Sequence, residues 1–460
     1  MSVLYPTLLL CVYGFFSNMR PAEPFLTAFL MGPDKNLTEI QVVSEIYPIW
    51  TYSYLMLLFP VFLATDYLCY KPVLVVQATS LVVTYIMLLK AQGLLAMQFL
   101  EFFFGLATAS EVAYYSYIYS VVEPEHYQRV TSYCRSIALF GSAAGSLMGQ
   151  LLLSVAKAEL LYLVIVTLTS AAAAFVAPWF LPMPKRSLFF HQSPGAAKEE
   201  TGDEESKVPL KIHNVKTVST PSEAETSSGL VKVLQMLFED FVQCYRCRPL
   251  LAWSLWWALA TCGYFQVINY TQALWENIRP SKDHEIFNGY VEALSTLLGA
   301  LAALLVGYLP VCWAVWGELA LCVLSLLMAT CVFIMDTLSN IWLCYSSYVI
   351  FRAIYMLLIT VATFQIAANL NMQRYALVFG VNTFMALVLQ TLLTVVVVDS
   401  AGLGLDVFTQ FLIYGGYFVV ISSIFLLAGL LRLASSRRSK TEVEWSEPNS
   451  PSVSDSTPCR

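Results

Sequence analysis

Charged side chains are scarce in this 460-residue chain, because Asp, Glu, Lys and Arg together make up only 12% of it. A soluble domain has about 25% charged residues and about 45–50% apolar ones, whereas this chain is 58% hydrophobic. The composition therefore excludes an ordinary soluble protein and predicts a polytopic membrane protein that lies in the lipid bilayer. The formal net charge of −6 says little, because the charges are sorted between the two sides of the membrane, and no nucleic-acid partner is expected.

Histidine is also rare, and none of the four histidines lies inside an apolar segment. This distribution argues against a histidine proton relay and against an intramembrane metal site. The 11 cysteines lie mostly inside apolar segments, where they act as small hydrophobic residues. Cys244 and Cys247 form a C-x-x-C motif, but no second pair follows at the spacing of a zinc site. We expect no metal, no cofactor and, without a catalytic constellation, no enzymatic activity.

Long apolar runs dominate the rest of the sequence, and each is predicted to be a transmembrane helix, because backbone polar groups in hydrocarbon must be satisfied within the segment. The runs cover residues 4–31, 47–65, 72–89, 94–120, 129–154, 159–181, 249–273, 285–309, 312–334, 339–365, 375–398 and 408–433. A stretch rich in Lys, Glu, Ser and Thr divides these twelve segments into six and six. We therefore predict a six-helix bundle over 1–182, a largely disordered cytoplasmic linker over 183–248, a second bundle over 249–433 and a disordered tail over 434–460.

Lys and Arg are distributed unequally between the two sides of the predicted membrane. If the N-terminus is cytoplasmic, most of them, including those of the linker and the tail, fall on the cytoplasmic side. Positive residues favour that side, so both termini are predicted to be cytoplasmic. The sequon at Asn36 then falls in an outside loop and is predicted to carry a glycan. A second sequon at Asn269 lies at membrane depth, and we interpret Asn269 as a polar group that faces the bundle interior.

The most unusual stretch is 98–120, QFLEFFFGLATASEVAYYSYIYS, which carries Glu101 and Glu111 at membrane depth among phenylalanines and tyrosines. Acidic residues at this depth are costly and usually face a cavity or a pathway for an ion or a polar substrate. Because aromatic faces attract cations, the stretch predicts a route for a cation. The alternative is that each glutamate pairs with an arginine of a neighbouring helix, which for Glu111 would be Arg135 or Arg352.

The ionisable residues inside the predicted spans show an acidic excess. The acids are Glu23, Glu101, Glu111, Glu292 and Glu318, and the bases are Arg20, Arg135 and Arg352. Discounting Glu318, which lies near a helix start, still leaves one acid without a basic partner. On the first span, Pro21 and Pro24 flank Glu23 and are expected to break the helix. Irregular backbone of this kind is common at transporter binding sites.

Several longer motifs carry a resemblance to one known family. They include RPAEPF from Arg20, GPDKNLT from Gly32, DYLCYKP from Asp66, ALVFGVNTF from Ala376 and GLGL from Gly402. Together they resemble the reduced folate carrier and thiamine transporter family over nearly the whole chain, apart from 191–229 and the tail. The resemblance implies an all-α membrane protein with a major-facilitator fold, in which twelve transmembrane helices form two six-helix bundles. It also implies alternating access at the plasma membrane, and a monomer is expected.

Two positions distinguish the branches of this family. Where the folate carrier has an arginine on helix 4 and a lysine on helix 11, this chain has Glu111 and Gln390. Those bases suit an anionic folate, whereas thiamine carries a permanent thiazolium charge. The resemblance therefore implies thiamine uptake through an acidic and aromatic cavity, with Gln390 as a specificity position. The alternatives are another vitamin or organic cation, such as pyridoxine, and a folate carrier.

The substrate site of the thiamine branch can be carried over residue by residue. By this resemblance, Glu101 accepts a hydrogen bond from the aminopyrimidine, while Trp50 and Tyr47 stack on the ring. Asn269 and Glu23 complete the polar contacts. The full set is Glu23, Tyr47, Trp50, Glu101, Phe104, Asn269 and Glu292, and a charge network or coupling role falls to Glu111, Arg135 and Arg352.

The chain departs from the family pattern at two positions, since Phe104 replaces a usual tyrosine and Cys69 replaces a usual cytoplasmic arginine. Without the resemblance, a channel with a continuous pore is also compatible with the sequence. A seven-helix receptor conflicts with the twelve segments, and an intramembrane enzyme lacks a catalytic constellation. Proton antiport and facilitated diffusion fit the sequence equally well.

Overall fold

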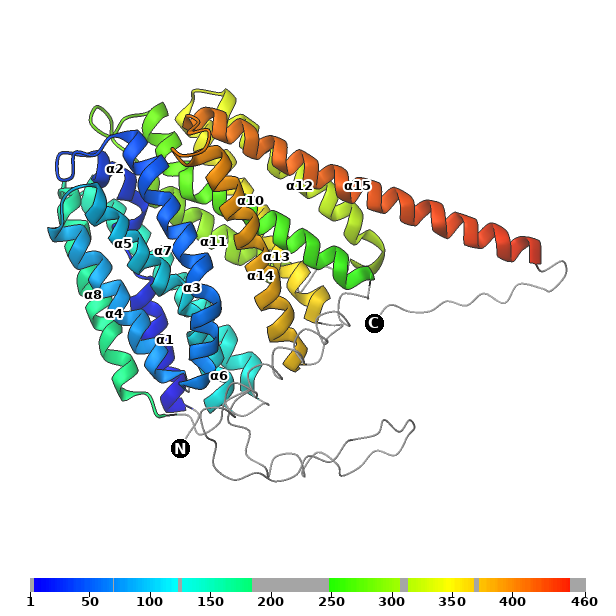
Figure 1. The fold of residues 1–460 in the computed structure, drawn as a ribbon, viewed down its shortest axis with the longest axis horizontal. Helices are drawn as coiled ribbons and strands as arrows, with labels where there is room; N and C mark the ends of the chain where they lie inside the picture. Colours follow the sequence, from blue (N-terminus) through cyan, green and yellow to red (C-terminus); the bar gives the residue numbers. More distant parts are fainter. Residues whose placement is uncertain are drawn as a thin grey trace.

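The computed structural model describes residues 4–68, 70–122, 126–183, 248–306, 313–367 and 372–446, and their regular structure is entirely helical. Figure 1 shows the helices of residues 4–183 gathered beside those of residues 248–446. The first half contains α1 (Leu4–Asn18), η1 (Glu23–Phe25), α2 (Leu26–Met31), η2 (Gln41–Ile46), α3 (Tyr47–Tyr67), α4 (Lys71–Lys90), α5 (Leu94–Ala109), α6 (Glu111–Val121), α7 (Tyr127–Ser154) and α8 (Leu160–Phe180). The second half contains α10 (Arg248–Ile278), α11 (Asn288–Val306), α12 (Trp313–Thr337), α13 (Ile341–Ala367), α14 (Met372–Leu393), η5 (Thr394–Val398) and α15 (Val407–Ser446). The predicted linker, apart from its two ends, and Cys69 lie outside the described residues.

Ten helical stretches within the described residues are long and apolar enough to cross a membrane. The other two predicted spans, the first and the seventh, are helical but differ in kind. The first is divided between α1, with 15 residues, and the short η1 and α2. The seventh, α10, has 31 residues, but its tryptophans and polar side chains keep its hydropathy low. The predicted all-helical architecture, with ten helices that could cross a membrane, is therefore confirmed for the described residues.

Prolines break the first span, as the sequence predicts. Pro21 and Pro24 lack the backbone N–H that a helix requires, and the chain between α1 and α2 forms only one turn of 3₁₀ helix. The N–H of Ala22 donates instead to the hydroxyl of Thr167 on α8, at 3.0 Å. The break places Glu23 at the start of η1 rather than inside a continuous helix.

Three glycines on α7 allow the broken first span to lie directly on that helix. A Cβ atom at Gly145 would lie 2.7 Å from the backbone N of Arg20, and one at Gly149 would lie 2.5 Å from the carbonyl oxygen of Pro21. A Cβ at Gly141 would similarly meet the carbonyl oxygen of Phe15 at 2.6 Å. Small residues at a spacing of four are typical of close helix packing in membranes, and here they position the segment that carries Glu23.

The two halves meet through α3 with α14 and through α7 with α11. Hydrogen bonds between them gather at the end that carries the loops 32–40, 279–287 and 399–406. The hydroxyl of Tyr52 donates to Asp399 at 2.6 Å, and the amide of Asn277 donates to Glu39 at 2.6 Å. Lys157 forms an ion pair with Glu285 at 2.7 Å at the same end. These contacts close that end of the molecule, which we call the closed end.

The last helix is longer than predicted. We expected a disordered tail from residue 434, whereas α15 continues as helix to Ser446. No proline or glycine interrupts the sequence between Leu430 and Ser446, so nothing local ends the helix after the apolar part. Residues 447–460 lie outside the described part of the chain.

Candidate functional site

Glu101 lies on the buried face of α5, together with Met97, Leu100 and Gly105. Only 4% of the residue is exposed. Among the described residues, no hydrogen bond or ion pair reaches its carboxylate, although Glu23 acts on it electrostatically. Burying an ionised group without a partner is costly, so this carboxylate is suited to a ligand that brings a positive charge or hydrogen-bond donors.

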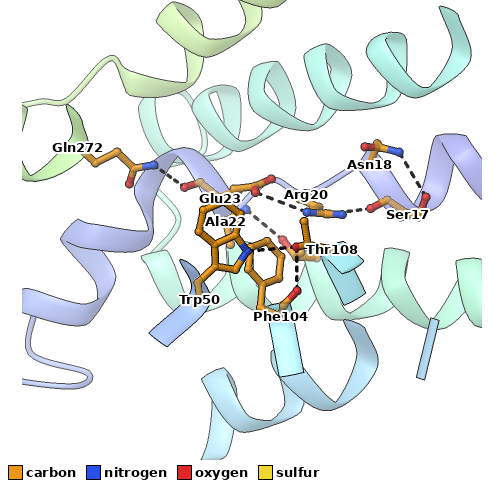
Figure 2. A network of polar contacts seen from close by, with 10 residues as sticks. Ser17, Asn18, Arg20, Ala22, Glu23, Trp50, Phe104, Thr108 and Gln272 are labelled. Atoms are coloured by element: carbon orange, nitrogen blue, oxygen red, sulfur yellow. Dashed lines mark hydrogen bonds and ion pairs between the residues drawn. The ribbon is translucent and has the colours of Figure 1, made fainter. Parts of the chain in front are cut away.

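Glu23 acts on Glu101 electrostatically but differs from it in exposure. Its side chain is 48% exposed and forms an ion pair with Arg20 at 3.5 Å. The guanidinium of Arg20 also donates to the carbonyl oxygen of Ser17 at 2.7 Å, and its Cζ lies 5.5 Å from the ring centre of Phe104. Figure 2 shows these residues around the break in the first span. The ring face of Phe104 therefore contacts a cation. This contact does not need the hydroxyl of the tyrosine that the family usually has at this position.

Trp50 and Tyr47, which were predicted to stack on the substrate, lie on α3 at the boundary between the halves. The indole N–H of Trp50 donates to the hydroxyl of Thr108 on α5, at 3.1 Å (Figure 2). Its ring meets that of Phe265 on α10 edge to face, with centroids 6.1 Å apart. Tyr47 shares a hydrogen bond of 2.7 Å with Thr27. These contacts fix the positions of both side chains, and the rings remain apolar surfaces.

Asn269 supplies a second unpartnered polar group from the other half. It lies on α10, and its side-chain Nδ2 is buried without a hydrogen-bond partner among the described residues. A buried amide without partners costs free energy comparable to a lost hydrogen bond. Glu101 and Asn269 therefore offer an acceptor and a donor that a bound ligand can satisfy.

The structure gives Glu292 a partner that the sequence analysis did not assign to it. Its carboxylate on α11 forms a very close ion pair with Arg352 on α13, and it accepts a hydrogen bond from Tyr348 at 2.6 Å. Arg352 also donates to Ser295 at 2.8 Å. Arg352 therefore pairs with Glu292 and not with Glu111. The carboxylate of Glu292, which was predicted to contact the substrate, is engaged in this ion pair in the structure.

Glu111 begins α6 and is exposed at the point where α5 ends. Arg20 and Arg135 both act on it electrostatically, but its atoms form no ion pair within 4 Å in the described part of the chain. Gln390 is fully buried and donates to the hydroxyl of Thr51 on α3, at 3.3 Å. The predicted specificity position therefore lies in the seam between the halves.

Two further residues contact the broken span and were missed in the sequence. Gln272 on α10 and Asn288 on α11 donate hydrogen bonds to the backbone carbonyl oxygens of Glu23 and Pro24. A single polar residue in an apolar span carries no signal that identifies its partner. Among the described residues, no cluster of three or more His, Cys, Asp or Glu side chains is arranged to hold a metal ion.

Two solved structures with a similar arrangement of helices are those of transporters. The nucleoside transporter NupG has a TM-score of 0.60 at 12% identity, and the comparison covers 92% of this chain and 99% of that chain. A POT family transporter bound to a thioalcohol-conjugated peptide has a TM-score of 0.63, also at 12% identity, over 92% and 95%. At this identity the likeness concerns the fold alone, and the chain shares the fold of these two transporters.

The sequence comparisons narrow this class. The family described as Reduced folate carrier matches residues 1–413, and the chain belongs to that family of membrane transporters. It is 58% identical to Thiamine transporter 1 of Homo sapiens, over 92% of this chain and 89% of that protein. Thiamine transporter 2 of Homo sapiens is 50% identical, over 98% and 95%, and the human Reduced folate transporter is 39% identical, over 92% and 71%. The predicted family is thereby confirmed.

Proposed function

We propose that this protein takes up thiamine across the plasma membrane by alternating access, as a monomer with twelve transmembrane helices and cytoplasmic termini. The observation that carries the proposal is Glu101, a buried carboxylate without a partner among the described residues. The higher identity to the thiamine transporters than to the reduced folate transporter supports the same substrate. The break at Glu23 and the closed end between the halves agree with a transport cycle in which the two halves move.

The charge of the site favours an organic cation over an anion. At an effective dielectric of about 20, two unit charges 4 Å apart interact by about 4 kcal/mol. A thiazolium cation near Glu101 gains from this interaction, while a folate carboxylate is repelled by a similar amount. Trp50 and Tyr47 offer ring faces for the planar groups of thiamine, and Asn269 offers an unused donor.

Uptake of labelled thiamine tests the proposal, with Glu101→Gln as the main variant. The substitution keeps the shape of the side chain and removes its charge, so the apparent KM is expected to rise at least about 10-fold while surface expression stays near normal. Glu285→Gln is the matched control, because Glu285 is a carboxylate that lies in an exposed ion pair at the closed end. Normal uptake by Glu101→Gln contradicts the assignment of this residue.

Competition on the unmodified protein tests the substrate itself. Unlabelled thiamine is expected to inhibit uptake strongly, whereas reduced folates and thiamine pyrophosphate, which carry negative charges, are expected to inhibit weakly. Stronger inhibition by pyridoxine than by thiamine indicates the alternative of another cationic vitamin. Inhibition by reduced folates without inhibition by thiamine overturns the substrate and leaves the family assignment intact.

A further inference from the structure

The break in the first span leaves backbone groups that need partners outside their own helix. In hydrocarbon, an unsatisfied backbone N–H or C=O costs several kcal/mol, and irregular backbone persists only where protein or water satisfies it. Around Pro24, two carbonyl oxygens and one N–H are satisfied by side chains of the opposite half. These side chains belong to Gln272 on α10 and Asn288 on α11.

Gln272 bonds to the backbone on both sides of Pro24. Its Nε2 donates to the carbonyl oxygen of Glu23 at 2.9 Å, and its Oε1 accepts from the N–H of Thr27 at 3.2 Å. Figure 2 shows the first of these bonds reaching across from the second half to Glu23. A primary amide is suited to this task because it carries a donor and an acceptor side by side.

Asn288 adds a third hydrogen bond to the same turn. Its Nδ2 donates to the carbonyl oxygen of Pro24 at 3.1 Å, and its Oδ1 accepts from the hydroxyl of Tyr345 at 2.9 Å. Asn288 is 5% exposed. The backbone that places Glu23 is thus held by side chains of the opposite half, in addition to Thr167 of its own half.

In the proposed transport cycle, these bonds join parts that separate when the closed end opens. The broken span lies on α7 of the first half through the glycine contacts, whereas Gln272 and Asn288 move with the second half. A rigid motion of one half against the other lengthens all three hydrogen bonds. The backbone of Glu23, whose carboxylate acts on Glu101 electrostatically, is then released at the same moment.

We propose that Gln272 is a positioning residue that holds the broken first span, and with it Glu23, while the closed end is shut, and that release of its two hydrogen bonds is part of opening that end. The inference rests on the proposed function, since it assigns Gln272 a place in a transport cycle. It identifies a residue that acts on the site through backbone atoms and without contact to the substrate.

Hydrogen exchange measured by mass spectrometry on the full-length protein in lipid nanodiscs tests this without any substrate. Gln272→Met keeps the length of the side chain and removes both hydrogen bonds. Exchange in peptides covering 26–31 and 279–287 is expected to rise about 5-fold or more, because two hydrogen bonds are lost from the closed state. A peptide covering 71–90 on α4 reports global stability and is expected to stay unchanged.

Two further variants sharpen the comparison. Lys157→Met is the matched control, because it also removes a contact between the halves at the closed end, but one that is exposed and weakly stabilising. It is expected to leave exchange at 26–31 unchanged. Asn288→Ala removes one bond from the same turn and is expected to raise exchange there, so it provides the test if Gln272→Met fails to fold.

Thiamine uptake provides the second readout. Gln272→Met is expected to lower the maximal rate of thiamine uptake more than the apparent affinity for thiamine. The reason is that Gln272 stabilises a conformation of the protein and does not contact the ligand. Unchanged exchange at 26–31 in a folded Gln272→Met protein overturns the inference. A raised KM at an unchanged maximal rate also overturns it, since Gln272 is then a ligand contact. If the unmodified protein takes up no thiamine, the proposed function fails while the exchange data still decide the role of Gln272.

Discussion

The ion pair between Glu292 and Arg352 gives the most direct test of how charge is arranged in the second half. Sequence reasoning placed Glu292 at the substrate, whereas the structure surrounds it with Arg352 and Tyr348. The perturbation we consider is Glu292→Gln, which keeps the shape of the side chain and removes its charge. The replacement amide can still accept the hydrogen bond of Tyr348, so the main loss is the ion pair.

The burial of the ion pair determines how much free energy of unfolding Glu292→Gln is expected to cost. The side chains of Glu292 and Arg352 are 19% and 17% exposed, so solvent screens the pair only weakly. Removing one partner of a buried pair costs about 3–5 kcal/mol, because the remaining charge is left uncompensated. Arg352 keeps its hydrogen bond to Ser295, which places the expected cost of Glu292→Gln near the lower end, at about 3 kcal/mol. Arg352→Gln is expected to cost a similar amount, whereas the double variant is expected to be close to neutral.

Reversible unfolding in mixed micelles, driven by an increasing fraction of denaturing detergent, measures the free energies of unfolding of the unmodified protein, the two single variants and the double variant. These four values form a double-mutant cycle. The expected coupling energy is at least about 2 kcal/mol, since the double variant removes both charges together. Stability of Glu292→Gln equal to that of the unmodified protein contradicts the reasoning, and so does a double variant whose loss is the sum of both single losses. Thiamine uptake by a folded double variant then decides whether Glu292 also contacts the substrate.

Three other predictions concern regions outside this pair. Asn36 lies exposed in the loop 32–40, so Asn36→Gln and Thr38→Ala are each expected to increase gel mobility by loss of one glycan, and a glycan at Asn269 contradicts the topology. Asp406 caps α15 by accepting hydrogen bonds from the hydroxyl and the N–H of Thr409 at 2.6 and 3.2 Å, and Asp406→Ala is expected to cost about 1 kcal/mol in the same unfolding assay. The hydrogen bond from the Thr409 hydroxyl lowers the pKa of Asp406. The stabilisation by Asp406 is therefore present above the usual carboxyl pKa of about 4 and is lost as the pH falls through the lowered pKa of the folded state. An equal cost of Asp406→Ala at pH 7 and pH 2 contradicts this. Gly145→Ala forces a Cβ against the backbone N of Arg20 and is expected to cost about 1–3 kcal/mol, whereas Gly416→Ala, at a position with open space, is expected to leave stability nearly unchanged.

Hydropathy predicted the helices well because the polar groups of a backbone in a bilayer must form their hydrogen bonds within the segment. The segment 72–89 corresponds to Lys71–Lys90, and 159–181 corresponds to Leu160–Phe180. Prolines likewise predicted the break at Glu23, since the loss of an N–H is a local property. The end of α15 was misplaced because polarity marks where a helix leaves the membrane and says nothing of where it stops being a helix.

Partners across the bundle could not be predicted in the same way. Glu292 and Arg352 are 60 residues apart in sequence, and Glu111 was an equally reasonable partner for Arg352 on the evidence of the sequence. Gln272 and Asn288 are ordinary polar residues until the fold brings them to the carbonyl oxygens of Glu23 and Pro24. Such choices depend on how helices are rotated and packed, which a pattern of apolar residues constrains only weakly.

Counting charges in the sequence predicts one acid without a basic partner, and the contacts of the described residues show which acids have a partner. Of the four acids left after Glu318 is set aside, Glu292 is neutralised by Arg352 and Glu23 is paired with Arg20. Glu111 lies under the influence of Arg20 and Arg135. This leaves Glu101 as the buried carboxylate without a basic partner among the described residues. An organic cation that carries one positive charge then makes the site neutral as a whole, whereas a dianionic folate leaves it with a negative charge that no group in the described site offsets.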